Sequence, residues 1–470
     1  MRVTVQLISK KEGERMNQET AQNKYLYVGR KLPYHQIMNP QEIPSTSKII
    51  QAVQKNKATY QCFRCGNREQ NYFCSHFCAR CSSMCTYCRK CIVMGKMTTC
   101  TKLIVNELDM KKEDQRGGLE WDGKLSPQQK EASLKVMEAV KGNTDLLLWA
   151  VCGAGKTEML FEAIDVALQE GKFVCIATPR VDVVIELAKR FQTAFPKTPI
   201  AILYGGSEDK WEGQRITIST VHQLMNFRRI FHLLIIDEVD AFPYNIEEHL
   251  HWVVDEARTK TGSTIQLTAT PSTKQQHLAH RDKIEYAMAP ARYHRQPLPV
   301  PDFQWIGNWR KTIQKNNKLP APLMKWLQSI LKANSSIFLF IPTIDISSAV
   351  EEAVKKLTVK TTSVHSQDPL RHEKVSAFRN GDVSVLITTT ILERGVTIKN
   401  SQIAVLGSDE EIFTESALVQ ISGRAGRHID YPSGEIMFFH NGISEEMVRA
   451  KKQILQMNQL GFEKGWLDKK

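Results

Sequence analysis

Residues 146–157 read LLLWAVCGAGKT: an apolar run leads directly into a loop with two glycines, and the loop ends at Lys156 and Thr157. Glycines let a backbone wrap closely around phosphates, and the amides that open the following helix point at the anion. Lys156 supplies a charge for the outer phosphates, and the Thr157 hydroxyl can ligate Mg²⁺. The first consensus glycine is replaced by Ala150. The stretch predicts a strand, a phosphate-binding loop and a helix that bind a nucleoside triphosphate through Gly153, Ala154, Gly155, Lys156 and Thr157.

A second apolar run, at residues 233–236, ends in Asp237 and Glu238. The first acid in such a pair can hold Mg²⁺ through water, and the second can activate the attacking water as a general base. Adjacent acids at a strand end are also common in solvated turns. The phosphate-binding loop upstream favours the catalytic interpretation, with Asp237 at the metal and Glu238 as the base.

Residues 420–427 read QISGRAGR. Arginine stabilises the charge that develops during phosphoryl transfer, and two arginines three positions apart can reach across a cleft to one γ-phosphate. Alone, this segment could be a basic turn. Beside the loop and the paired acids, it completes a predicted catalytic set of Lys156, Asp237, Glu238, Arg424 and Arg427.

The rest of the chain from residue 125 alternates short runs rich in Val, Ile and Leu with longer helical patterns, which is typical of parallel sheets with crossover helices. A segment with four prolines at 289–301 interrupts the alternation, which then resumes over a similar length. The sequence therefore predicts an α/β fold with two tandem parallel-sheet lobes. The expected strands are 146–151, 173–178, 216–220, 233–237 and 265–268 in the first lobe, and 337–341, 361–364, 383–388 and 403–406 in the second.

The length of 470 residues is too great for one ordinary domain. The charged, glycine-containing segment at 111–118 has the composition of a linker. The expected division is an N-terminal extension at 1–60, a zinc-binding domain at 61–101, a first lobe with its linker at 102–290, and a second lobe at 291–470.

The charge balance favours a polyanionic partner, because 63 basic and 50 acidic residues leave a formal net charge of +13. The apolar runs are much shorter than the roughly 20 residues of a membrane-spanning helix. The first residues lack the apolar core of a signal peptide. We therefore expect a cytoplasmic protein.

Nine of the eleven cysteines lie within residues 62–100, in a chain without a secretion signal, so metal binding is a better interpretation than disulfides. The overlapping C-x₂-C pairs leave the ligand assignment ambiguous. We expect one closed, structural Zn²⁺ site from Cys62, Cys65, Cys88 and Cys91, and the remaining Cys74, Cys78, Cys81 and Cys85 can form a second, nested site. Aromatic and basic residues alternate through this segment, a pattern suited to binding a nucleic acid strand.

Together these motifs resemble, in order and across about 300 residues, the motif set of the superfamily 2 helicases. The resemblance implies two RecA-like lobes that hydrolyse ATP between them, with Mg²⁺. It also implies that Gln129 contacts adenine and that Gln420 belongs to the nucleotide site. The matching segments are LSPQQ at 125–129, ATPR at 177–180, TIST at 217–220, DEVD at 237–240, TAT at 268–270, TTTILERGVT at 388–397 and QISGRAGR at 420–427.

The same resemblance implies which residues face the phosphates of a bound strand: Arg180, Thr220, Thr270 and Thr390. Such contacts do not depend on base sequence and weaken with salt. Each threonine is equally explained as an ordinary helix cap.

A closer resemblance joins PRVDV at 179–183, DEVDAFP at 237–243, TTTILERGVT at 388–397 and the N-terminal cysteine cluster. This combination resembles the ComFA family of late-competence proteins in Gram-positive bacteria. It implies a cytosolic ATPase that moves along single-stranded DNA and helps draw transforming DNA through a membrane channel. The implied partners are single-stranded DNA and the membrane DNA-uptake machine at its cytoplasmic face. Peripheral attachment to the inner face of the cell membrane and oligomerisation are left open.

Two other functions stay open at this stage. A PriA-like replication-restart helicase also joins such lobes to zinc sites, although its zinc cluster lies between the helicase motifs and its second motif reads DEEH. A scaffold that uses ATP only as a conformational switch is the alternative from another class. The motifs do not decide between unwinding a duplex and translocating without unwinding.

Overall fold

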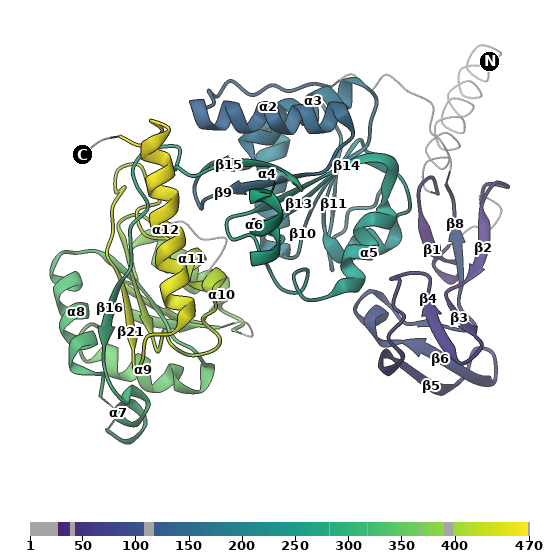
Figure 1. Cartoon of the computed structure of the whole chain (residues 1–470). Helices are drawn as coiled ribbons and strands as arrows, with labels where there is room; N and C mark the ends of the chain where they lie inside the picture. Colours follow the sequence, from purple (N-terminus) through teal and green to yellow (C-terminus); the bar gives the residue numbers. More distant parts are fainter. Residues whose placement is uncertain are drawn as a thin grey trace, which may run out of the picture.

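The computed structural model describes residues 27–37, 43–107, 117–281, 283–316, 318–365, 368–389 and 398–468. These residues form a small β-rich N-terminal unit and two α/β lobes (Figure 1). Residues 390–397, which include the predicted strand contact Thr390, lie outside the described residues, as do residues 111–116 of the predicted linker.

Lobe 1 is built on a seven-stranded parallel sheet in the order β11-β12-β10-β13-β14-β9-β15. The central strands are buried along their whole length because helices cover both faces. The strands are β9 (Leu146–Ala150), β10 (Val174–Thr178), β11 (Ile200–Leu203), β12 (Ile216–Thr220), β13 (Phe231–Asp237), β14 (Arg258–Thr268) and β15 (Glu285–Ala289), and the helices are α2 (Pro127–Gly142), α3 (Phe161–Gln169), α4 (Val181–Ala194), α5 (Glu248–Ala257) and α6 (Thr273–His280).

Lobe 2 repeats this architecture with a six-stranded parallel sheet in the order β16-β21-β20-β17-β19-β18. The predicted α/β fold with two tandem lobes is therefore confirmed. The strands are β16 (Asp302–Trp305), β17 (Ser336–Phe340), β18 (Thr361–Val364), β19 (Val385–Thr388), β20 (Ser401–Leu406) and β21 (Ile436–His440), and the helices are α7 (Trp309–Asn316), α8 (Ala321–Lys332), α9 (Ser347–Lys355), α10 (Arg371–Asn380), α11 (Glu415–Ser422) and α12 (Glu445–Glu463).

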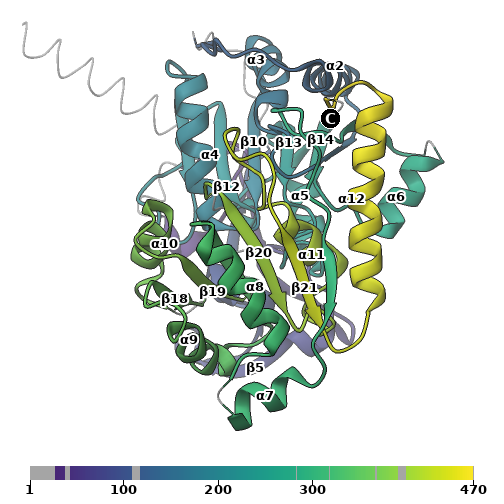
Figure 2. The same ribbon diagram turned by 90° about the vertical axis from the view of Figure 1, so that its left-hand side faces the viewer.

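The two lobes share one continuous cluster of buried apolar residues. Helix α12 of lobe 2 extends upward to the level of α2 of lobe 1 (Figure 2). On the way, the Gln453 side chain donates a hydrogen bond of 2.8 Å to the carbonyl of Ala269 in lobe 1. The Asn458 amide bonds both backbone groups of Leu298, which lies in the crossover between the lobes. The C-terminal helix therefore fastens the lobes together.

The N-terminal unit contains three small antiparallel arrangements of strands. A sheet in the order β1-β8-β2 joins β1 (Lys31–Pro33), β2 (Lys48–Gln51) and β8 (Lys102–Val105). The expected boundaries at residues 60 and 101 cut through this sheet, so the extension and the cysteine-rich segment are one unit that continues to β8. The other strands are β3 (Val53–Asn56) paired with β4 (Thr59–Cys62), and β5 (Phe73–Cys78), β6 (Ser83–Cys88) and β7 (Met97–Thr98) in the order β5-β6-β7.

The N-terminal unit packs on lobe 1 through a shared apolar cluster. The buried Arg64 guanidinium donates a hydrogen bond of 2.8 Å to the Asn226 side chain on the short helix η6 (Val221–Asn226). Lys90 pairs with Glu247, which precedes α5. The backbone of Gly66 lies flat against the Trp252 ring, so that a Cβ atom there would sit 2.3 Å from the indole. These contacts make the interface intolerant of added volume.

We expect Gly66→Ala to destabilise the protein more than Gly206→Ala. Both glycines have positive φ, 77° and 89°, so each change carries the backbone strain of a left-handed alanine, about 1 kcal/mol. Only position 66 adds a clash, because nothing lies within 4 Å of a Cβ at Gly206. Overpacking should cost Gly66→Ala a further 1–3 kcal/mol, roughly. Thermal unfolding measures the difference, and equal melting temperatures would contradict this account of the interface.

Candidate functional site

A cavity of about 590 Å³ lies between the lobes, a size typical of small-ligand sites. Lobe 1 contributes the phosphate-binding loop and the end of β13, and lobe 2 contributes the segment after α11. The predicted residues that line it are Gln129, Gly153, Gly155, Lys156, Thr157, Asp237, Glu238, Gln420, Arg424 and Arg427. The structure thus brings together residues that lie almost 300 positions apart in the sequence.

The phosphate-binding loop is held in shape from behind by Gln129. Its side-chain amide donates a hydrogen bond of 2.8 Å to the Ala154 carbonyl. Its side-chain oxygen accepts a hydrogen bond of 2.8 Å from the Ser126 amide. Gly153 and Gly155 have φ of 85° and 76°, which favours glycine, and a Cβ at Gly155 would lie 2.3 Å from the Gln129 nitrogen. In this structure Gln129 positions the loop, and its contact with adenine stays a prediction.

The paired acids stand where β13 ends, facing the loop. The Glu238 amide donates 2.9 Å to the Asp237 carboxylate. Glu238 has φ of 58°, a left-handed conformation that costs a glutamate on the order of 1 kcal/mol and that clusters at functional sites. Both carboxylates line the cavity. Together with Thr157, they offer the oxygen ligands and hydroxyl that Mg²⁺ prefers.

The arginines of lobe 2 reach the loop because α11 packs directly on it. The Cys152 thiol donates 3.0 Å to the Gln420 side-chain oxygen. At Gly423, the end of α11, a Cβ would lie 2.6 Å from Cys152. This close approach carries Arg424 and Arg427 to the cavity wall, where Arg424 is almost fully buried.

The carboxylate of Asp240 links three motifs across the lobe interface. Thr268 and Thr270 of lobe 1 each donate 2.7 Å to one of its oxygens. From α11 of lobe 2, the Ser416 hydroxyl donates a hydrogen bond of 3.0 Å to the same carboxylate, and the Gln420 side-chain amide donates one of 3.4 Å. Ser416 was not predicted, although it lies four residues before Gln420 and therefore on the same helix face.

Arg292, in the crossover between the lobes, is a positioning residue that the sequence did not reveal. Its buried guanidinium donates to the carbonyls of Gly423, Ala425 and Gly426, at 3.1 Å and 2.8 Å for the first two. Burial lowers its pKa to about 10, so it stays charged at neutral pH. The next residue, Tyr293, donates its amide to the Gly153 carbonyl at 3.3 Å. The crossover therefore holds the loop and the arginine segment in register.

The predicted strand contacts lie in different surroundings. Arg180 precedes α4 and makes a two-pronged ion pair with Asp182, at 2.9 and 3.1 Å, while Arg371 of lobe 2 approaches the same carboxylate at 3.6 Å. Burial raises the Asp182 pKa, but these arginines outweigh it and hold that pKa below its usual value. Thr220 precedes η6, and its hydroxyl does not cap that helix.

Thr270 is nearly buried, and its hydroxyl is engaged by Asp240 and Ser416. A direct contact with a strand would have to break those bonds, so the role of Thr270 in strand binding stays a prediction. The helix-cap explanation does not apply to the Thr270 hydroxyl in this structure.

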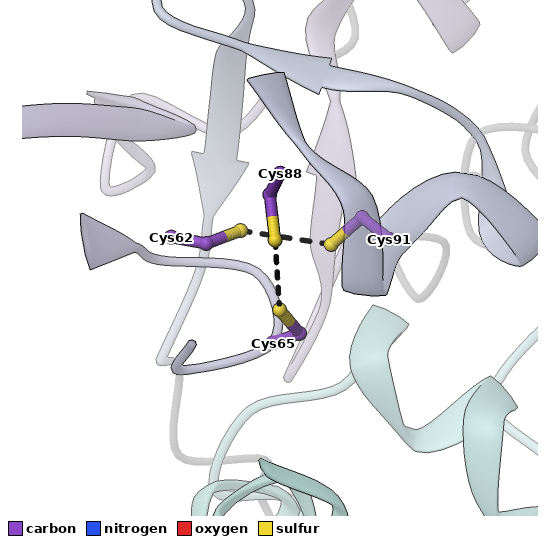
Figure 3. A group of neighbouring side chains, drawn as sticks. All are labelled: Cys62, Cys65, Cys88 and Cys91. Carbon is purple, nitrogen blue, oxygen red and sulfur yellow. Dashed lines mark hydrogen bonds between the residues drawn. The ribbon is translucent and has the colours of Figure 1, made fainter. Parts of the chain in front are cut away.

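The four cysteines expected for the first metal site lie together. Cys62, Cys65, Cys88 and Cys91 point at one another from the end of β4, the turn after it, the end of β6 and the short helix η4 (Arg89–Met94) (Figure 3). The sulfurs of Cys62 and Cys91 are 3.6 Å apart, and those of Cys65 and Cys88 are 3.7 Å apart. A tetrahedral zinc ion with bonds of about 2.3 Å requires separations of about 3.8 Å.

Buried cations beside this cluster also fit a metal tetrathiolate, which carries a net charge of −2. Arg64 and Lys31 are fully buried and interact electrostatically with the thiols. Burial lowers the Lys31 pKa to about 8, and its ammonium has no hydrogen-bond partner among the described residues. An anionic centre would compensate the cost of burying these charges.

The second expected cysteine set is wrong in one member. The structure groups Cys78, Cys81 and Cys85 with Cys100, and Cys74 lies elsewhere. Cys74 and Cys78 stand on the same strand, four residues apart, which separates their Cα atoms by about 13 Å along β5. One ion cannot bridge that distance. Cys100 follows β7, and its sulfur lies 3.7 Å from that of Cys78.

This two-lobed arrangement, with a phosphate-binding loop facing a pair of arginines across one cavity, defines an ATP-dependent enzyme of the superfamily 2 helicase type. The family models agree with that class. Residues 122–273 match the type III restriction enzyme, res subunit, and residues 322–429 match the helicase conserved C-terminal domain.

The particular family follows from the whole chain. Residues 17–105 match the competence protein ComFA N-terminal domain. Competence protein ComFA of Bacillus subtilis is 44% identical over 405 residues, which cover 86% of this chain and 87% of that protein. Competence protein ComFA of Streptococcus pneumoniae is 35% identical over 395 residues, which cover 81% of this chain and 90% of that protein. The chain belongs to the ComFA family and is a competence-related, helicase-like protein. No helix among the described residues is long and apolar enough to cross a membrane.

We expect purified protein to contain two zinc ions, and Cys100→Ser to remove one of them while Cys74→Ser removes none. The serine hydroxyl is a poor replacement for a thiolate ligand. Metal analysis of the refolded or native protein gives the count directly. Loss of zinc in Cys74→Ser but not in Cys100→Ser would restore the original ligand set and contradict the geometry.

We expect Arg292→Lys to lower kcat of ATP hydrolysis about 10- to 100-fold, with little change in KM for ATP. A lysine keeps the charge but cannot bond several carbonyls at once, and a shift of about 1 Å in catalytic groups costs rates of that order. Arg295→Lys is the matched control, because Arg295 forms an exposed pair with Asp468 at 2.8 Å. A normal kcat with only a lower melting temperature would make Arg292 purely structural.

Proposed function

We propose that this protein is a single-stranded-DNA-dependent ATPase that moves along the strand and drives uptake of transforming DNA. The observation that carries the proposal is the shared cavity, in which the loop and acids of lobe 1 face Arg424 and Arg427 of lobe 2. ATP bound there would contact both lobes, so hydrolysis would change how the lobes hold each other.

The catalytic roles follow from the geometry of the cavity. Lys156 would hold the outer phosphates, and Thr157 and Asp237 would hold Mg²⁺, which neutralises phosphate charge when bound. Glu238, fixed at the end of β13, would take the proton of the attacking water. Arg424 and Arg427 would stabilise the charge that develops on the γ-phosphate, from the other side of the cavity.

Coupling to the strand would run through contacts that span the lobes. Asp240 joins the acid motif to α11, and Asp182 joins Arg180 of lobe 1 to Arg371 of lobe 2. Arg180 follows β10 and Thr220 ends the adjacent parallel strand β12, so both lie at the same edge of the sheet. Single-stranded DNA along that edge would bind to both lobes and would dissociate when the lobes separate.

Zinc in the two cysteine groups would be structural, because four thiolates leave no open coordination position. We further propose that the protein works at the cytoplasmic face of the membrane DNA-uptake machine. The ComFA family supports this location, and the basic charge of the chain suits an anionic substrate.

Steady-state ATPase assays with single-stranded DNA, duplex DNA, RNA or no polymer test the proposal. We expect single-stranded DNA to stimulate hydrolysis most, and Lys156→Ala to abolish the stimulated rate, since it removes the charge on the outer phosphates. Glu238→Gln should still bind ATP but lose about 10²–10⁴ in rate, as expected for loss of a general base. Hydrolysis that ignores every polymer would instead favour an ATP-switched scaffold.

A further inference from the structure

We propose that the N-terminal unit carries a second binding surface for single-stranded DNA, on one face of the β5–β6 hairpin. This inference rests on the proposed function only for the identity of the strand. The hairpin patch is defined as Phe77, Met84 and the turn residue Arg80 of the hairpin, together with Lys55 of β3 and Tyr60 of β4 beside it.

The charge of the N-terminal unit fits an anionic strand. Residues 43–107 contain ten Lys and Arg and two Glu, so this seventh of the chain holds a formal charge of +8 out of +13. Two zinc tetrathiolates would subtract four and still leave the unit basic. A concentrated positive charge on a small unit attracts polyanions through release of their counterions.

The position of the unit places it next to the predicted strand contacts of lobe 1. Arg64 bonds Asn226, the last residue of η6, and that short helix begins directly after Thr220. The interface is tight, because Gly66 packs on Trp252 and Lys90 pairs with Glu247. The N-terminal unit therefore borders the short helix that follows Thr220.

The hairpin presents apolar side chains to solvent where a folded unit would normally bury them. Phe77 and Met84 stand directly opposite each other on β5 and β6, and each is 67% exposed. Along the same face of β5, Phe73 lies four residues before Phe77, and its ring contacts Tyr60 with centroids 5.7 Å apart. Lys55 lies over the Tyr60 ring at 5.7 Å. The apolar side chains on this face of the hairpin thus continue onto the Tyr60 ring of β4, which Lys55 of β3 covers.

Unpaired bases are the partner that fits this surface best. Successive bases of a single strand stack on aromatic rings while cations track the phosphates, and every base offers such a face, so the contact needs no sequence. Arg80 is exposed in the turn between β5 and β6, where one guanidinium nitrogen lies 3.4 Å from the His35 ring nitrogen and the others can meet a phosphate. In a duplex the base faces are already stacked and unavailable.

The second cysteine group lies behind this surface and stiffens it. Side chains alternate along a strand, so Cys78 and Cys85 face away from Phe77 and Met84. With Cys81 in the turn and Cys100 after β7, they enclose the tip of the hairpin. A metal-closed tip would present Phe77 and Met84 at little cost in conformational entropy.

The test measures single-strand binding by the full-length protein. Fluorescence anisotropy monitors binding of labelled oligo(dT) of about 10 and about 40 nucleotides. We expect Phe77→Ala/Met84→Ala to weaken binding of the long oligonucleotide about tenfold, the effect of losing one stacked base, and to leave the short one unchanged. Val359→Ala/Ile443→Ala, on exposed residues of lobe 2, is the matched control. Arg80→Ala should lower the salt slope of binding by about one.

The outcomes separate the two proposals. Wild-type ATPase without stimulation by single-stranded DNA would overturn the proposed function. Normal stimulation and an unchanged long-oligonucleotide affinity in Phe77→Ala/Met84→Ala would overturn only the hairpin surface. Unchanged strand affinity together with lost binding to vesicles of anionic lipid would assign the patch to a membrane. Polymer-free ATPase and zinc content, which the exposed changes should not alter, report that the variants are folded.

Discussion

The hydrogen bonds on the Asp240 carboxylate are the interaction on which the arrangement of the lobes depends. The Asp240 carboxylate is half-buried at the lobe interface, where a charge withdrawn from water is stabilised by hydrogen-bond donors. Thr268 and Thr270 provide partners from lobe 1, and Ser416 and Gln420 provide them from lobe 2. All of these bonds form together only in one relative placement of the lobes. That placement also seats α11 against the phosphate-binding loop, so the same few bonds that satisfy Asp240 complete the catalytic cavity.

The N-terminal unit obeys a different constraint, since it is too small and too basic to bury an adequate core by itself. It solves this by sharing an apolar cluster with lobe 1 and by surrounding a cysteine tetrad with buried cations. The stability of the unit therefore depends on both the apolar cluster shared with lobe 1 and the cysteine tetrad. A change in one of them should also affect the other. The unit is consequently packed on lobe 1 as an extension of that lobe's apolar core.

The sequence predicts the elements whose local pattern of apolar and polar residues reflects directly how they are buried in the fold. Central strands such as β9 and β10 are continuous apolar runs because they are buried on both faces, and the phosphate-binding loop must lie between strand and helix. The edge strands β11 and β15 were missed because they are only partly buried and do not form continuous buried runs. Strands β16 and β21 of lobe 2 were also not predicted. Cys100 was missed because it reaches the cluster through the pairing of β6 with β7. The spacing of the cysteines in the sequence does not indicate that pairing. Arg292 gave no signal, because its partners are backbone carbonyls more than 130 positions away.

The crossover between the lobes has a consequence for how such proteins can change over time. Because Arg292 and Tyr293 contact both the arginine segment and the phosphate-binding loop, the connector is as much a part of the catalytic cavity as the lobes are. Exchanging one lobe between two relatives at the proline-rich junction would separate the connector from one of its two sets of partners. Recombination should therefore keep the connector together with both lobes, and the N-terminal unit, which shares a buried apolar cluster with lobe 1, should be inherited with that lobe.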